Sequence, residues 1–236
     1  MWRIIEYNYQ LFLQGLLVTL LLAVVGTVGG FFLSLLFVAA RTSKVDKKRD
    51  PLIVKIMKKI SSWFVLFYVT IFRGTPMILQ AMVFFYGLLL AGIQIQPLQA
   101  GLLVVTLNTT AYIIEILRGA VNGIDKGQME AARSLGFSRF KALMLFVYPQ
   151  AIKNAIPAIV SEFIVNLKDT AVLSVIGVMD LFRQLELIFM TPGGNAALDL
   201  NVFVIGGLMY LFITTVTTVI ALLVERGMNK EVRLNA

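Results

Sequence analysis

The chain has 236 residues, of which 58% are hydrophobic and 14% are charged, and its mean hydropathy is +0.85. A soluble domain has roughly 45–50% apolar residues, so this composition indicates a membrane protein. The sequence has no Cys and no His, which excludes disulfides, metal–thiolate sites and histidine-based metal or acid–base chemistry. The net charge of +8 does not predict a nucleic-acid partner, because the basic residues fall in stretches that flank apolar segments.

The first apolar segment covers residues 11–40, and no charge occurs within residues 16–40. About 20 apolar residues suffice to cross a hydrocarbon core, so this segment predicts one full crossing. Gly26 and Gly30, four residues apart, would allow another helix to approach closely. We expect one transmembrane domain, residues 1–236, with spans at about 11–40, 76–93, 98–117, 155–178 and 202–224.

The distribution of Lys and Arg predicts the orientation of these spans. Seventeen of the 21 Lys and Arg residues lie in the loop 41–59, the loop 118–153 and the tail 226–233. With five spans, all three stretches lie on one side of the membrane, and the positive-inside rule makes that side cytoplasmic. We therefore expect the N-terminus outside and the C-terminus in the cytoplasm.

The segment 52–72 is apolar enough to resemble a further span. Its three lysines, Lys55, Lys58 and Lys59, favour a helix that lies along the cytoplasmic interface. The chain would then turn into the membrane at the sequence RGTP, where Pro76 is tolerated in the first turn of a helix. If this segment crossed the membrane fully, the charge asymmetry would be lost.

The loop after the third predicted span contains GQMEAARSLGFSRF, which carries both signs of charge. Asp125 can cap a helix over residues 126–135, and Gly136 can end it in a left-handed conformation. A second short helix would begin after Ser138 and stop near Pro149. The small side chains and charged groups of the first helix suit docking into a cleft on a partner, while an amphipathic surface connector is the alternative.

The sequence EAARSLG followed by FVYP resembles the cytoplasmic EAA loop of ABC importer permeases. Its pattern falls here on Glu130, Ala131, Ala132, Gly136 and Pro149, although the family has smaller aliphatic residues where this chain has Phe and Tyr in FVYP. Four more segments and the sequence YPQA resemble the polar-amino-acid branch of that family. In chain order the segments are QGLLVTL, FRGTP, AYIIEILRGA and NLKDTAVLSVIGV.

The resemblance implies an all-α membrane protein with the five transmembrane helices of the type I ABC importer permease fold and a cytoplasmic coupling loop at about residues 119–149. The coupling helix would fit a groove on a separate ATPase and transmit ATP-driven closure to the membrane helices. Its contact residues would be Glu130, Ala131, Ala132, Arg133 and Gly136. This chain would bind no cofactor, since ATP and Mg²⁺ belong to the partner, and the sequence has no GxxxxGK[ST] pattern.

The resemblance also implies the assembly: two copies of the ATPase, an extracytoplasmic substrate-binding protein and a second permease subunit in a bacterial inner membrane. We take that subunit to be a second copy of this chain, with a paralogue as the alternative. The substrate would be an amino acid and the chain would not be an enzyme. A secondary transporter driven by an ion gradient is the competing function, but it would usually show more spans and an internal repeat.

Two stripes of polar residues follow the third and fourth predicted spans. Spacings of four and three place each set on one helix face. The stripes are Asn108, Tyr112 and Glu115, then Glu162, Asn166 and Asp169. Ionisable groups inside a membrane are costly, so they usually serve a function or are paired. Both stripes should therefore face something other than lipid.

Depth separates the roles of these residues. Glu115 lies near the cytoplasmic end of its span and can pair with Arg118, which favours a structural role. Asn108, Glu162 and Asn166 lie near the middle and are the candidate substrate-binding residues. The carboxylate of Glu162 suits the ammonium or cationic head of an amino acid, with a strut between helices as the alternative. Glu162 favours arginine, lysine or histidine as substrate, without excluding glutamine or acidic amino acids.

Overall fold

The computed structural model describes residues 1–42, 51–194 and 196–234, with the backbone alone at residue 224 and residues 227–234. Every long element in this part of the chain is helical. The helices are α1 (Trp2–Thr42), α2 (Leu52–Gly74), α3 (Met77–Leu90), α4 (Pro97–Gly123), α5 (Lys126–Ser134), α6 (Arg139–Ala142), α7 (Tyr148–Asp169), α8 (Leu181–Met190) and α9 (Asn201–Leu234). A π-helical segment, Leu143–Val147, joins α6 to α7, and a 3₁₀ segment, Thr170–Ile176, follows α7.

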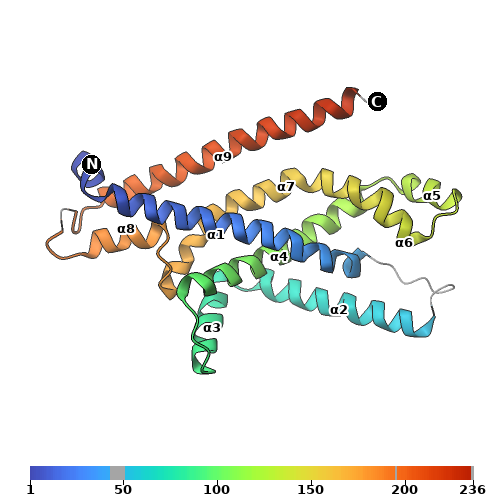
Figure 1. The fold of residues 1–236 in the computed structure, drawn as a ribbon, viewed down its shortest axis with the longest axis horizontal. Coiled ribbons are helices and arrows are strands. Elements are labelled where there is room, and N and C mark those ends of the chain that lie inside the picture. Colours follow the sequence, from blue (N-terminus) through green and yellow to red (C-terminus); the bar gives the residue numbers. More distant parts are fainter. Residues whose placement is uncertain (43–50, 195, 235–236) are drawn as a thin grey trace.

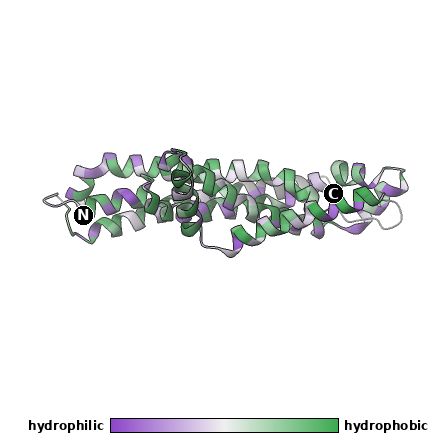
Figure 2. Ribbon diagram, turned by 90° about the horizontal axis from the view of Figure 1, so that it is seen from below, coloured by the Kyte–Doolittle hydropathy of each residue, from purple (hydrophilic) through white to green (hydrophobic). Residues whose placement is uncertain are grey.

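The helices form an elongated bundle. Helices α1, α2, α4 and α7 run along its length, α5 and α6 lie at one end, and the N-terminus and α8 lie at the other (Figure 1). Helix α9 starts beside α8 and diverges from the bundle toward its C-terminus. Most residues of the helices between the two ends are hydrophobic, shown in green in Figure 2. In the described chain, three helical stretches are long and apolar enough to cross a membrane: Trp2–Thr42, Pro97–Gly123 and Asn201–Leu223.

The core of the bundle is the contact between α1 and α4, which depends on glycine. A Cβ atom added at Gly26 would lie 2.2 Å from Cγ1 of Val105, and one at Gly30 would lie 3.1 Å from the backbone nitrogen of Thr110. Neither position has room for a side chain without movement of α4. The predicted close approach at these two glycines is confirmed.

Helix α2 lies beside α1 and α4 rather than across the end of the bundle (Figure 1). Its buried residues Val65 and Val69 pack against Ala111 and Ile114 of α4. This arrangement differs from the expected interfacial helix. The reason is that the lysines occupy only the first turns of α2, while the remainder offers an apolar face that matches α4.

The predicted second span, 76–93, corresponds to α3, which points away from the long axis of the bundle (Figure 1). Its 14 residues cover about 21 Å at 1.5 Å per residue, less than the ~30 Å of a hydrocarbon core. The break between α2 and α3 falls at Thr75, whose backbone is extended, as a residue before proline prefers. The two helices therefore form a bent unit.

Two further boundaries differ from expectation. The second short helix of the loop does not stop near Pro149 as predicted. A π-helical segment continues it into α7, and the backbone nitrogen of Tyr148 donates to the carbonyl of Leu143, five residues back. This widened turn leads into α7 with Pro149 in its first turn, where the missing N–H is tolerated. At the other end, α7 stops at Asp169 instead of continuing to residue 178, and the 3₁₀ segment ends at Gly177 with a φ of 87°.

Candidate functional site

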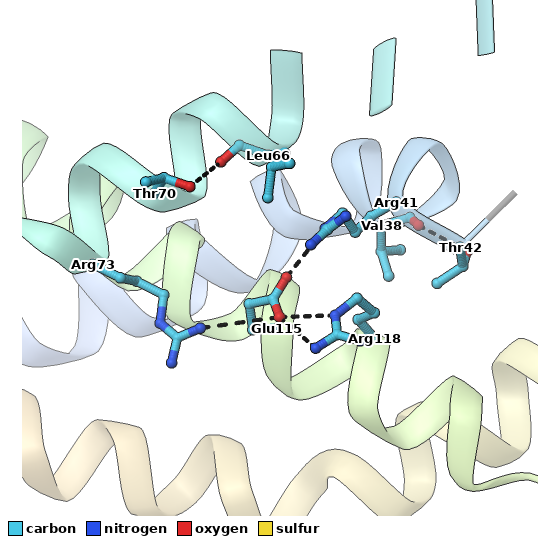
Figure 3. Close-up of polar contacts among 8 residues, drawn as sticks. All are labelled: Val38, Arg41, Thr42, Leu66, Thr70, Arg73, Glu115 and Arg118. Carbon is cyan, nitrogen blue, oxygen red and sulfur yellow. Dashed lines mark hydrogen bonds and ion pairs between the residues drawn. The ribbon is translucent and has the colours of Figure 1, made fainter. Parts of the chain in front are cut away.

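A cluster of charges joins three helices around Glu115 of α4 (Figure 3). One oxygen of Glu115 accepts a hydrogen bond from Nε of Arg41 on α1 at 3.2 Å, and the other lies 2.7 Å from Nη2 of Arg118. Nη1 of Arg73, near the end of α2, lies 4.0 Å from the same carboxylate. The predicted pair with Arg118 is confirmed. The contributions of Arg41 and Arg73 were not predicted, because both residues lie on other helices.

Arg73 is the most exposed charged side chain of this cluster. Three guanidinium groups around one carboxylate leave a local excess of positive charge. The guanidinium of Arg73 also lies 5.1 Å from the centre of the Tyr112 ring, a cation–π distance. Its side chain is 43% exposed, against 14% for Glu115. A guanidinium has five N–H donors, so Arg73 is placed to bind a further acceptor from the exposed side.

Asn108 holds the break between α2 and α3. Its amide nitrogen donates to Oε1 of Gln80 at 2.9 Å and to the backbone oxygen of Phe72 at 3.2 Å. Gln80 in turn donates to the same oxygen of Phe72 and to the carbonyl of Thr75. The side chain of Asn108 is therefore buried and engaged within the chain.

Asn166 links three helices in the middle of the bundle. Its amide nitrogen donates to the hydroxyl oxygens of Thr27 on α1 at 2.9 Å and Thr109 on α4 at 3.0 Å. Only 3% of Asn166 is exposed. A buried amide with both donors satisfied stabilises the contact of α7 with α1 and α4. Among the predicted substrate residues, Asn108 and Asn166 thus lie inside the bundle rather than on an open surface.

Glu162, one turn before Asn166, is only partly buried. Its charge interacts electrostatically with those of Arg73 and Asp169. Glu162 of α7 and Arg73 of α2 thus lie within range of each other's charge, whereas the sequence pattern had grouped Glu162 with the two asparagines. We call Arg73, Tyr112, Glu115 and Glu162 the charged face. It presents both signs of charge, which suits a ligand that is itself zwitterionic.

The loop between α4 and α7 has the predicted local structure. The carboxylate of Asp125 accepts a hydrogen bond from the nitrogen of Gly127 and caps α5. Gly136, with a φ of 85°, follows the helix in the left-handed region. A bond from the nitrogen of Phe137 to the oxygen of Ala132 completes the turn. The prediction of a capped helix that ends at Gly136 is confirmed.

Four of the five predicted coupling residues lie on the surface: Glu130, Ala131, Arg133 and Gly136. Ala132 is 3% exposed, so its methyl group faces the chain's own core. Two large apolar side chains of the same loop face solvent, Leu135 at 76% exposure and Phe140 at 65%. Neither residue was predicted from the sequence. For Leu135 a signal was available, because it is an apolar residue directly before the glycine that ends the helix.

Polar contacts tie this loop to the bundle. The hydroxyl groups of Thr42, the last residue of α1, and Tyr148, the first residue of α7, are 2.7 Å apart. Nε2 of Gln150 on α7 donates to Oε1 of Gln128 on α5 at 3.3 Å. These two contacts connect α5 to α7 and α7 to α1.

Residues 52–230 match the family described as "Binding-protein-dependent transport system inner membrane component", and the chain belongs to this family. Its lengthwise bundle of apolar helices, with a capped helix at one end, has the fold of a type I ABC importer permease subunit.

Similar proteins support this assignment. The chain is 37% identical over 216 residues to the arginine transport system permease protein ArtQ of Bacillus subtilis, covering 91% of this chain and 90% of the relative. It is 31% identical to the probable glutamine ABC transporter permease protein GlnM of the same organism, covering 88% of each. Among solved structures, an amino acid ABC transporter with histidines matches 94% of this chain and 95% of that chain, with a TM-score of 0.78 and 32% identity.

A second solved structure, the inward-facing MetNI methionine ABC transporter, has a TM-score of 0.73 at 19% identity and supports the fold alone. The chain is therefore a multi-pass transport subunit rather than an enzyme, and ATP hydrolysis belongs to a separate subunit. These findings do not favour the ion-gradient alternative.

In the described residues, no group of three or more acidic side chains is placed to hold a metal ion.

Proposed function

We propose that this chain forms half of the path by which an ATP-driven importer carries a basic or polar amino acid across a bacterial inner membrane. The similar chains named above are called arginine and glutamine permeases, which supports this substrate class. The observation that carries the proposal is the charged face. An amino acid has a carboxylate and an ammonium group, and Arg73 and Glu162 offer one partner for each.

In this proposal Glu162 contacts the ammonium or cationic head of the substrate, and Arg73 receives its carboxylate. Asn108 and Asn166 do not contact the substrate in this proposal, because their amides form hydrogen bonds within the bundle. Asn108 fixes the end of α2 that carries Arg73, and Asn166 fixes the part of α7 that carries Glu162. The predicted substrate residues are thus divided into one contact and two positioning residues.

A second permease subunit would complete the site. The partly exposed position of Arg73 leaves one side of the charged face open in a single chain. We propose that a second copy of this chain covers it, with two ATPase subunits below and a binding protein above. Purification of two differently tagged copies tests the homodimer, since a paralogue in place of the second copy would prevent their joint recovery.

We propose that the five spans are α1, α2, α4, α7 and α9, and that α3 lies within the outer leaflet. This topology keeps five crossings and the charge asymmetry, because α2 replaces the predicted span at 76–93. The N-terminus is then outside and the α5 end is cytoplasmic. Single cysteines introduced into this cysteine-free chain would test it: a cysteine at Ser138 should react with an impermeant maleimide only from the cytoplasmic side.

At the cytoplasmic end, α5 would enter a groove of the ATPase. Glu130, Ala131 and Arg133 supply its exposed surface, while Gly136 sets the turn that follows and Ala132 anchors the helix to its own chain. The exposed Leu135 supplies an apolar side chain whose burial in the groove would favour binding.

Uptake by the complete transporter in proteoliposomes tests the substrate site. Glu162→Gln should raise the KM for a basic amino acid at least tenfold, because the cationic group of the bound substrate loses its counter-charge. The amount of assembled complex should stay the same. Glu186→Gln on α8, outside the charged face, is the matched control. Equal KM values for wild type and Glu162→Gln would reduce Glu162 to a strut between helices.

A further inference from the structure

The N-terminal end of α2 is strongly basic. Helix α2 has four basic residues and no acidic ones, and three of the four are Lys55, Lys58 and Lys59. A groove of about 470 Å³ runs along this end of the helix. Its lining includes the three lysines together with Ser62, Trp63 and Leu66. The function proposed above does not use these residues.

The lining residues follow one another along the helix in a definite chemical order. Lys55, Lys59, Ser62 and Leu66 are spaced by four, three and four, so they form one stripe. At 1.5 Å per residue, about 10 Å separate the levels of Lys59 and Leu66. Moving toward the middle of the bundle, the groove therefore passes from cationic groups to a hydroxyl and then to an apolar side chain.

The surroundings of the groove are those of a membrane surface. Ile53, Ile56 and Ile60 are exposed beside the lysines at 72%, 48% and 62%. Trp63 is 65% exposed and stacks on Phe67, with ring centres 5.6 Å apart. Tryptophan is enriched where headgroups meet hydrocarbon, so its position marks the lysines as lying at headgroup level.

We propose that this groove binds the headgroup of an anionic phospholipid. The phosphate lies among Lys55, Lys58 and Lys59, the ester region near the hydroxyl of Ser62, and the start of an acyl chain along Trp63 and Leu66. Basic clusters at the cytoplasmic end of a span attract anionic lipids in this way. The inference rests on the proposed topology, which makes this end of α2 cytoplasmic. An acidic protein surface on the lysines is the competing occupant.

Native mass spectrometry of the purified transporter complex tests the site. The complex is titrated with phosphatidylglycerol or with phosphatidylcholine of the same acyl chains, for wild type and for the variant Lys55→Gln, Lys58→Gln, Lys59→Gln. A second variant replaces the same lysines with Arg to keep the charge. The matched control, Lys141→Gln, Lys153→Gln, Arg226→Gln, removes three exposed cations elsewhere on the proposed cytoplasmic side.

Wild type, the Arg variant and the control should retain phosphatidylglycerol in preference to phosphatidylcholine. The triple Gln variant should lose this preference, with affinity for phosphatidylglycerol lower by about 100-fold. Equal retention of the two lipids by wild type would overturn the proposal, as would an unchanged preference in the Gln variant or an equal loss in the control. Loss of the ATPase from the Gln variant with its lipid preference intact would assign the lysines to a protein contact instead. Absence of the ATPase from wild type would count against the importer assembly and is read from the same spectra.

Discussion

Glu115 is the point at which removal of one side chain should cost most stability, because it is the shared ion-pair partner of three arginines from α1, α2 and α4. The variant Glu115→Gln preserves the shape of the side chain and removes its charge. Removing one partner of a fully buried ion pair costs about 3–5 kcal/mol. Here the arginine side chains are 22%, 43% and 38% exposed, so water compensates part of the loss. We therefore expect a loss of about 2 kcal/mol, which is below that range.

Thermal unfolding of the purified chain in mild detergent measures this effect. For a chain of this size, 2 kcal/mol corresponds to a fall in Tm of roughly 4–8 °C. Glu186→Gln is the matched control, because among the described residues Glu186 forms its ion pair with Arg183, three residues away on the same helix, at 3.2 Å. The control should change Tm by less than about 2 °C. If both variants gave the same small shift, the cluster would not hold the three helices together.

Three more variants follow from the packing. Gly26→Ala should destabilise the chain by about 1–3 kcal/mol through overpacking against α4, while Gly87→Ala, where a Cβ meets nothing within 4 Å, should leave Tm unchanged or slightly higher. Gly136→Ala should cost about 1 kcal/mol because alanine is strained at its left-handed backbone, and it should weaken recovery of the ATPase, whereas Gly119→Ala in open space should do neither. Asn166→Ala should lower stability by about 2 kcal/mol by leaving two hydroxyl groups unpaired. An Asn166→Ala protein with unchanged Tm and a raised KM would instead make Asn166 a substrate ligand.

Features that depend on local sequence were predictable. Asp125 and Gly136 fixed the limits of α5, because a cap and a left-handed glycine act within one turn of the residues they stabilise. The spacing of Gly26 and Gly30 similarly predicted a close helix contact. The partner helix was not predictable, since a glycine pair contains no information about what approaches it.

Features that depend on tertiary contacts were missed. The lysines of α2 suggested an interfacial helix, whereas the packing of Val65 and Val69 on α4 places α2 within the bundle. Arg41 lies 74 residues from Glu115 in the sequence, and Gln80 lies 28 residues from Asn108. No periodicity within one helix could pair these residues. The same limit applies to Ala132, which shared a motif with exposed residues but faces the core.

The contact of α5 with a separate ATPase is central to the proposed function. Mild-detergent purification of the chain from its native membrane, followed by mass spectrometry, tests this claim most directly. We expect an ATPase to accompany wild type and the control Glu186→Lys on α8, and to be lost from Glu130→Lys, which reverses an exposed charge on α5. A chain that is purified without an ATPase and still supports uptake would contradict the account.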